Sequence, residues 1–310
     1  MSKKVTIVGA GNVGGTAAMR IYESGLARVA MIDIAATLAS AKAEDLQDAQ
    51  ALLGVNNRIE VSSDFALAEG SDIVVVTAGM PRKQGMTRED LLNRNADIME
   101  NVCRGVAQFA QGAIVVIVSN PLDVMTFFAR RRTGFPRQRL FGMGPSLDTS
   151  RFIHQIARTM RVSPLEVRAL VIGSHGETML PLGRLAMVRE KKIIDTLGAV
   201  GVEDLVRRTR QRGAEIVSLY GSGSAYYAPS AAVFEIVSTI LRGRRKEIPV
   251  SVCLEGEYGL TDVAIGVPAR IGPEGVERVI EVPLEPAERE AFEASARAIQ
   301  SSIASLLILP

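Results

Sequence analysis

Cysteine, histidine and tryptophan are scarce in this chain of 310 residues, which contains two, two and none of them respectively. Cys103 and Cys253 lie far apart in the sequence, and neither belongs to a paired-cysteine motif. This spacing argues against a disulfide framework and against a cysteine-rich zinc site. We therefore expect a cytoplasmic protein in a reducing environment, with no metal site.

Neither sign of charge dominates, because 36 basic and 34 acidic side chains leave a formal net charge of +2. Nucleic-acid binders are usually strongly basic or carry a known reader motif, and neither feature is found here. Long hydrophobic runs are also missing, since the runs at 73–76 and 113–118 fall far short of the roughly 20 residues that span a bilayer. We expect neither a nucleic-acid partner nor a membrane partner.

Material for a hydrophobic core is plentiful, at 47% hydrophobic and 23% charged residues, so a folded protein of one or two domains is expected. In the first half, short β-branched runs alternate with helix-length segments. The predicted strands are 5–8, 29–32, 59–62, 73–76 and 113–118, and the predicted helices are 13–24, 38–53 and 88–109. Such alternation predicts a doubly wound parallel sheet with helices on both faces, the Rossmann arrangement.

The pattern changes after about residue 145. Helices are predicted at 146–161, 202–220, 226–242 and 286–307, and strands at 247–253, 263–271 and 277–282. We therefore predict an N-terminal α/β Rossmann domain over residues 1–145 and a C-terminal mixed α+β catalytic domain over residues 146–310.

A glycine-rich turn follows the first predicted strand and matches G-x-G-x-x-G. Its residues are Gly9, Ala10, Gly11, Asn12, Val13 and Gly14. Glycines at these positions allow a tight turn and close approach of a pyrophosphate to the backbone at a helix N-terminus. Asp33 ends the second predicted strand, where a carboxylate accepts ribose hydroxyls and repels a 2′-phosphate. The pair favours NAD over NADP, although S-adenosylmethionine enzymes use a related loop and acid.

A cationic segment follows the predicted strand 73–76 and therefore lies at the carboxyl edge of the sheet, where ligands bind in doubly wound folds. It runs from Gly79 to Arg88 and carries Arg82, Lys83 and Arg88. Its glycines and proline are typical of a mobile loop, but basic surface loops are common, so this segment alone does not identify a ligand.

Several further motifs occur in order along the chain: 119–121 (SNP), 147–152 (LDTSRF), 173–177 (GSHGE) and 223–227 (GSAYY). Together with the glycine-rich turn, Asp33 and the loop 81–88, they resemble the malate and lactate dehydrogenase family. The resemblance extends over nearly the whole chain and is strongest to the lactate-dehydrogenase-like malate dehydrogenases. It implies NAD-dependent hydride transfer between malate and oxaloacetate, as in the tricarboxylic acid cycle, and a homodimer or homotetramer.

Of the two histidines, His154 lies in a predicted helix, whereas His175 lies between glycines just after a predicted strand. The resemblance implies that His175 is the proton donor and acceptor and that Asp148 binds its other ring nitrogen. A fixed carboxylate selects the tautomer, favours imidazolium and raises the histidine pKa. His175 is therefore expected to supply the acid for ketone reduction.

Arginines are the expected ligands of a dicarboxylate. Arg151 lies three residues after Asp148 on the same helix face, where its guanidinium can bind the C1 carboxylate through two hydrogen bonds. The resemblance implies that Arg88 and Asn120 bind the C2 oxygen. It places Arg82 at the second carboxylate, where lactate dehydrogenases of this family have glutamine, so oxaloacetate is the expected substrate.

The resemblance also implies that Asn95, Val118 and Asn120 contact the cofactor, that the Asn120–Pro121 bond is cis, and that loop 80–90 closes over the ligand. Two departures from the family pattern are visible: Glu177 stands where aspartate is expected, and the segment 143–146 before Leu147 is unusual.

Two other functions remain open. One is a lactate dehydrogenase of the same fold, and the other is a dinucleotide-binding sensor without turnover. Comparison of oxaloacetate with pyruvate in an NADH absorbance assay distinguishes all three.

Overall fold

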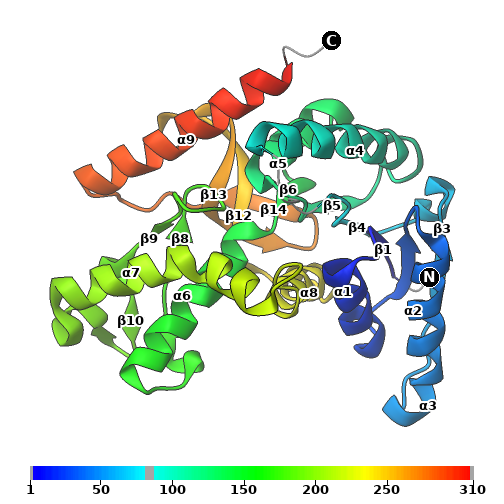
Figure 1. Ribbon diagram of the computed structural model, residues 1–310, viewed down its shortest axis with the longest axis horizontal. Coiled ribbons are helices and arrows are strands. Elements are labelled where there is room, and N and C mark those ends of the chain that lie inside the picture. Colours follow the sequence, from blue (N-terminus) through cyan, green and yellow to red (C-terminus); the bar gives the residue numbers. More distant parts are fainter. Residues whose placement is uncertain (1–2, 81–86, 308–310) are drawn as a thin grey trace.

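The computed structural model describes residues 3–80 and 87–307 (Figure 1). A nine-stranded sheet forms its centre, and six parallel strands of the first half follow the order β3-β2-β1-β4-β5-β6. The strands are β1 Lys4–Val8, β2 Arg28–Ile32, β3 Ile59–Ser62, β4 Ile73–Val76, β5 Ile114–Ile117 and β6 Leu140–Gly142. This order is the doubly wound Rossmann arrangement, so the predicted fold class is confirmed.

The central strands β1, β4 and β5 are buried along their whole length, as expected of parallel strands covered on both faces. Five α-helices connect the six strands in the described part of the chain. They are α1 Asn12–Glu23, α2 Ala36–Asp48, α3 Gln50–Leu53, α4 Arg88–Phe109 and α5 Leu122–Thr133. The predicted helices of this half are thus confirmed, with the stretch 38–53 divided into α2 and α3.

The second half contains four long helices: α6 Gly144–Met160, α7 Ile193–Tyr220, α8 Tyr227–Leu241 and α9 Pro286–Leu307. Helix α7 begins earlier than predicted and is interrupted at Gly198, whose φ is 65°. Two small sheets lie beside α6 and α7. In one, β8 Val171–Ile172 pairs with β9 Leu180–Pro181; in the other, β10 Met187–Val188 lies between β7 Val167–Arg168 and β11 Lys191–Lys192.

The three long strands of the second half extend the first sheet, which the sequence did not predict. They are β12 Lys246–Glu255, β13 Thr261–Gly272 and β14 Gly275–Val279, all antiparallel. Strand β12 joins β6 through the pair Ser251 and Gly142. The two halves therefore share one sheet.

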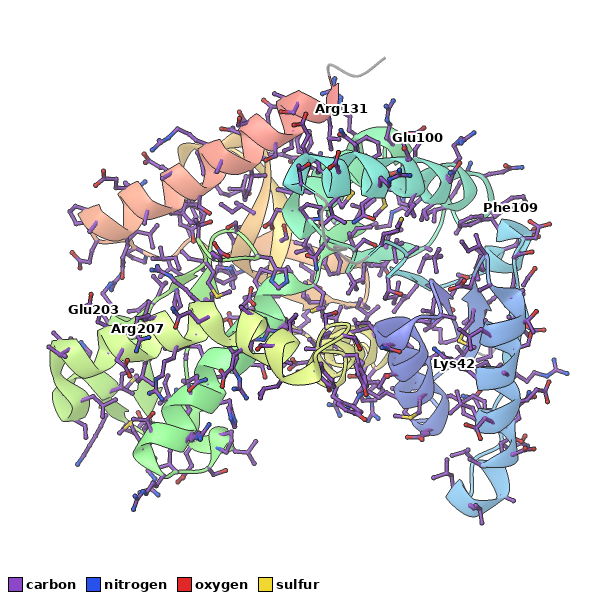
Figure 2. The ribbon with its side chains drawn as sticks, viewed as in Figure 1. Lys42, Glu100, Phe109, Arg131, Glu203 and Arg207 are labelled. Carbon is purple, nitrogen blue, oxygen red and sulfur yellow. The ribbon has the colours of Figure 1, made fainter. Side chains whose placement is uncertain are left out.

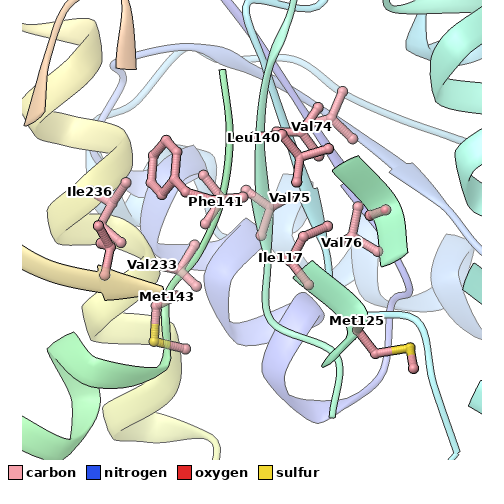
Figure 3. Packing of buried hydrophobic residues seen from close by; sticks show 14 of the residues in the cluster. Val74, Val75, Val76, Ile117, Met125, Leu140, Phe141, Met143, Val233 and Ile236 are labelled. Carbon is pink, nitrogen blue, oxygen red and sulfur yellow. The ribbon is translucent and has the colours of Figure 1, made fainter. Parts of the chain in front are cut away.

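The two halves also share one hydrophobic core. Figure 3 shows Phe141 and Met143, at and just after β6, beside Val233 and Ile236 of α8, with Met125 of α5 on the other side of the strands. Helix α8 also packs against α1 (Figure 1). This common packing holds the end of β5, the start of α6 and the segment after β8 in fixed relative positions.

Candidate active site

The glycine-rich turn joins β1 to α1 with backbone geometry that only glycine tolerates. Gly9 has a φ of 98°, and a Cβ on Gly14 would lie 1.8 Å from the carbonyl oxygen of Gly9. By contrast, a Cβ on Gly11 would meet nothing within 4 Å. Gly9 and Gly14 therefore allow the turn to pack closely on itself and against residues 77 and 78, which follow β4, while Gly11 leaves open space in front of the N-terminus of α1. This is the shape that a pyrophosphate requires.

Asp33 lies beside this turn at the end of β2. Its Oδ2 accepts a hydrogen bond from the Ala10 N–H at 2.6 Å, and its Oδ1 accepts one from the Ala35 N–H at 2.8 Å. Two backbone donors thus hold the carboxylate in place, and each oxygen keeps a lone pair for a further donor. The residues of the turn and Asp33 fit the adenosine and pyrophosphate parts of NAD.

Lys42 is a residue of this region that the sequence did not predict. Its Nζ crosses from α2 and donates to the carbonyl oxygens of Ala10 at 2.6 Å and Gly11 at 3.1 Å. Gly15 leaves room for it, since a Cβ there would lie 3.2 Å from the lysine side chain. Figure 2 shows Lys42 between α1 and α2. A lysine on an exposed helix carries no local signal of such a contact.

Asn95 and Asn120 meet at the ends of β4 and β5. The buried Asn95 donates from Nδ2 to the Asn120 carbonyl oxygen at 2.8 Å, and its Oδ1 accepts from the Met80 N–H at 2.8 Å. The Asn120–Pro121 peptide is cis, as predicted. Val118 follows β5 and is partly buried against the core. All these residues lie at the carboxyl edge of the parallel strands.

His175 and Asp148 form a buried pair. His175 Nδ1 lies 2.7 Å from Asp148 Oδ2, and the two side chains are 15% and 1% exposed. Asp148 comes from α6, and His175 from the segment after β8. Burial lowers the pKa of His175, but the charge of Asp148, its hydrogen bond to the ring and the charge of Asp123 outweigh burial and raise it above its ordinary value.

Arg151 extends this pair. Its Nη1 lies 3.5 Å from Asp148 Oδ1, on the same face of α6. Gly213 of α7 faces the guanidinium, and a Cβ there would lie 3.5 Å from Nη1. Among the residues that the structure describes, the buried Nε of Arg151 has no hydrogen-bond partner. Such a donor suits an acceptor brought by a ligand.

The unusual segment 143–146 forms the start of α6, with Pro145 in its first turn. A Cβ on Gly144 would lie 2.6 Å from Cγ of His175 and 2.7 Å from Leu122 Cδ2. The helix can therefore approach the imidazole only because this position is glycine. The segment leaves the pairing of Asp148 with His175 intact.

We expect Gly144→Ala to displace the imidazole and to lower kcat by roughly 10- to 100-fold, because small misplacements of a catalytic group are costly. Steady-state assays measure this loss, and thermal unfolding reports the accompanying strain. Gly112→Ala is the control, since a Cβ there meets nothing within 4 Å. Equal activity of the two variants would contradict the role of Gly144.

Asp123 is a second residue that the sequence did not predict. It lies in the first turn of α5 and is buried. Its Oδ2 accepts from the His175 backbone N–H at 2.7 Å, and its Oδ1 accepts from the Ser251 hydroxyl at 2.6 Å. Acids are common in the first turn of a helix because they favour the helix dipole, so the sequence did not distinguish Asp123 from an ordinary helix-start residue.

Some predictions fall where the structure gives no side chain. Arg82 lies outside the described residues, as does most of the loop 80–90. Arg88 is the first residue of α4, and only its backbone is described; Thr87 caps this helix through a capping box with Asp90. The predicted contacts of Arg82 and Arg88 therefore remain predictions.

Glu177, the other departure from the expected pattern, lines an open cavity of about 710 Å³. The cavity lies along α7, which contributes Glu203, Arg207 and Arg210 (Figure 2). The remaining lining residues are also from α7. Glu177 thus lies beside charged residues of α7.

Residues 3–80 and 87–307 contain no group of three His, Cys, Asp or Glu side chains that could hold a metal ion. Within these same ranges, the helices are too short or too polar to span a bilayer.

The dinucleotide-type turn and the buried histidine–aspartate–arginine group on a Rossmann sheet define a two-domain dehydrogenase. Family comparisons agree: the lactate/malate dehydrogenase NAD binding domain matches residues 3–142, and the lactate/malate dehydrogenase alpha/beta C-terminal domain matches residues 145–307. The chain belongs to the lactate/malate dehydrogenase family.

Proteins similar to this chain include malate and lactate dehydrogenases. The malate dehydrogenase of Trichormus variabilis is 46% identical over 97% of this chain and 93% of its own length, and that of a Roseiflexus species is 42% identical over 99% of both. The crystal structure of the Cryptosporidium parvum malate dehydrogenase has a TM-score of 0.96 at 34% identity and covers 100% of both chains. A lactate dehydrogenase from the same organism, complexed with lactic acid and NAD, also has a TM-score of 0.96, at 30% identity over 100% and 99%.

Proposed function

We propose that this protein is an NAD-dependent malate dehydrogenase. Malate and NAD⁺ give oxaloacetate, NADH and a proton: the hydride leaves malate C2, and the hydroxyl proton passes to His175. The observation that carries the proposal is the His175–Asp148 pair at 2.7 Å, together with the buried Nε–H of Arg151 beside it, which has no acceptor among the described residues. The names of the relatives support malate as the substrate.

NAD, when bound, supplies the hydride acceptor. The backbone of residues 9–14 and the N-terminus of α1 bind its pyrophosphate, and Asp33 binds the adenosine ribose hydroxyls. The negative charge of Asp33 disfavours a 2′-phosphate, so NAD is preferred over NADP. Asn95, Val118 and Asn120, at the ends of neighbouring strands, contact the nicotinamide half.

His175 provides the proton for the reductive direction. Asp148 accepts the Nδ1–H, which leaves Nε2 to donate to the ketone oxygen. In the oxidative direction the neutral ring accepts the hydroxyl proton. Since the pKa of His175 is raised, the imidazolium remains available at a higher pH than for an ordinary histidine.

Arginines orient the substrate. Arg151 binds the C1 carboxylate, and Arg88 and Asn120 polarise the C2 carbonyl. Arg82 binds the second carboxylate, and its loop closes over the site and excludes water. The dianionic substrate thus meets a local positive field in a chain that is almost neutral overall.

Arg82→Gln tests the substrate assignment. Because pyruvate has no second carboxylate to pair with the arginine, we expect the wild type to prefer oxaloacetate. In the variant, the ratio of kcat/KM for oxaloacetate to kcat/KM for pyruvate should fall by about tenfold or more. The ratio of kcat/KM for the two ketoacids measures it in an NADH absorbance assay. Lys83→Gln, which removes a neighbouring charge, should leave the ratio unchanged.

Each alternative has its own result in this assay. A lactate dehydrogenase, which the similarity to the Cryptosporidium parvum lactate dehydrogenase suggests, would reduce pyruvate at least as well as oxaloacetate. A dinucleotide sensor would bind NADH and oxidise it with neither ketoacid.

Further features belong to the same proposal. We place the domain boundary between residues 145 and 146; the two family matches, over residues 3–142 and 145–307, divide the chain close to this point. A homodimer or homotetramer uses α2 and α8, where Leu38 and Tyr227 are exposed by 59% and 58%; sedimentation velocity measures its mass.

The enzyme works in the cytoplasm within the tricarboxylic acid cycle, and its two buried, unpaired cysteines support a reducing compartment.

A further inference from the structure

The histidine of the site is held by two carboxylates, one on its ring and one on its backbone. We propose that Asp123 is a positioning residue for His175, which fixes the histidine backbone and keeps a second negative charge next to the imidazole. This inference rests on the proposed role of His175 as the proton donor.

The contacts of Asp123 join three distant parts of the chain. Its oxygens accept from the His175 N–H at 2.7 Å and from the Ser251 hydroxyl at 2.6 Å. Asp123 itself follows the cis peptide at Asn120 by three residues, in the rigid first turn of α5. The carboxylate therefore connects the histidine segment to the strand end that carries Asn120, so that the proton donor and the substrate-binding amide keep one relative position.

Ser251 is placed by the sheet junction. It pairs with Gly142 where β12 joins β6, and a Cβ on Gly142 would lie 2.5 Å from Thr126 Oγ1 and 3.1 Å from Ser251 Cβ. The glycine lets β12 approach closely enough for the Ser251 hydroxyl to reach Asp123. The anchor of the carboxylate thus depends on the extension of the sheet by the second half.

A neutral acceptor could make both contacts of Asp123, with the His175 N–H and with the Ser251 hydroxyl. These contacts alone therefore do not explain why a charged carboxylate is buried here. Burying a carboxylate is costly, and burial raises the pKa of Asp123 to about 6. Of the charged groups that face it, His175 lowers its pKa and Asp148 raises it. The positive charge of Arg151 lowers the histidine pKa.

The two groups therefore stabilise each other's charged forms. The Asp123 charge is one of the causes that raise the pKa of His175, and the imidazolium in turn favours the Asp123 carboxylate. An electrostatic role of this kind is separable from a mechanical one. Asparagine keeps the shape and one acceptor oxygen for the His175 N–H, its NH₂ group can donate to the Ser251 hydroxyl in place of the present bond, and the charge is removed, whereas alanine removes the shape, the contacts and the charge.

The direct measurement is an NMR titration of the full-length protein with ¹⁵N-labelled histidine. Only two histidines are present, so His154→Gln identifies the His175 signals. We expect Asp123→Asn to move the His175 midpoint to lower pH while NADH affinity stays at the wild-type value. Its kcat/KM for oxaloacetate should equal that of the wild type at low pH and fall below it as pH rises.

Asp123→Ala should lower kcat by up to about 100-fold at every pH, because the histidine backbone loses its anchor. Asp123→Asn should restore this loss at low pH but not at high pH, whereas a purely structural role of Asp123 predicts the same rescue at every pH. An unchanged His175 midpoint in Asp123→Asn overturns the electrostatic role, and wild-type kcat in Asp123→Ala overturns the positioning role.

Ser251→Ala provides a second route if the Asp123 variants fail to fold. Loss of the hydroxyl removes a hydrogen bond that favours the Asp123 carboxylate, so the His175 midpoint should again move to lower pH; no movement overturns the proposal. The titration needs no turnover. A wild-type protein that reduced no oxaloacetate would contradict the proposed function, and activity that survives in His175→Gln would contradict the role of His175 as proton donor, whereas the His175 midpoint in the Asp123 and Ser251 variants judges this inference alone.

Discussion

His175→Gln should lower kcat for oxaloacetate reduction by about 100- to 10,000-fold, the usual contribution of a positioned general acid. Glutamine keeps a polar side chain of similar size but carries no proton that it can release near neutral pH. The defect should lie in the proton transfer, so the affinity for NADH, measured by fluorescence titration, should stay close to that of the wild type.

The chain contains its own control for this experiment. His154 is the only other histidine and is exposed on α6, so His154→Gln should keep wild-type kcat. A His175→Gln variant that retained more than about a tenth of the activity would show that another group supplies the proton.

Asp148→Asn should have the second-largest effect, a loss of roughly 100-fold or more in kcat. The amide cannot balance the charge of the imidazolium, and its NH₂ group can select the wrong tautomer of the ring. Burial lowers the pKa of His175, and the Asp148 charge is the largest effect that opposes it. Without that charge, the imidazolium loses its main stabilisation.

The sign of the pH dependence follows from this. In the wild type, reduction needs imidazolium, so kcat/KM for oxaloacetate should fall as pH rises through the raised pKa of His175, while oxidation of malate should rise over the same range. In Asp148→Asn both inflections should move to lower pH. Profiles of the two proteins that share one inflection would contradict the assignment of Asp148.

The raised pKa also contributes to stability. A histidine whose folded pKa exceeds its unfolded value of about 6.5 stabilises the fold fully below that value, and this contribution is lost as pH rises through the folded pKa. Denaturant unfolding of Asp148→Asn should show less of this loss than the wild type.

Local patterns were sufficient to predict the parallel half of the sheet. Buried β-branched runs such as 73–76 alternate with helices of ordinary length, an order typical of a parallel sheet with helices on both faces. The glycine-rich turn and Asp33 were predicted from a short motif and its spacing after the first two strands. Strand β6, of three residues, was too short to leave such a pattern.

The long-range part of the site could not be predicted in this way. Lys42 and Asp123 have no distinguishing neighbours, and their roles follow from contacts with backbone atoms 32 and 52 residues away. The need for glycine at position 144 is equally invisible in the sequence, because the imidazole that it accommodates lies on a different segment.

By itself, the sequence determined the fold class and the dinucleotide turn, and it singled out His175 and Asp148, which the structure brings together, because periodicity, glycine spacing and family motifs are properties of neighbouring residues. Only the tertiary structure decided that β12 extends the sheet at β6 and that the Asp123 carboxylate accepts the His175 backbone N–H. The bond between Ser251 and Asp123 joins residues 128 positions apart. Contacts of that kind form only when the two halves bury a common core, and no local pattern of residues encodes them.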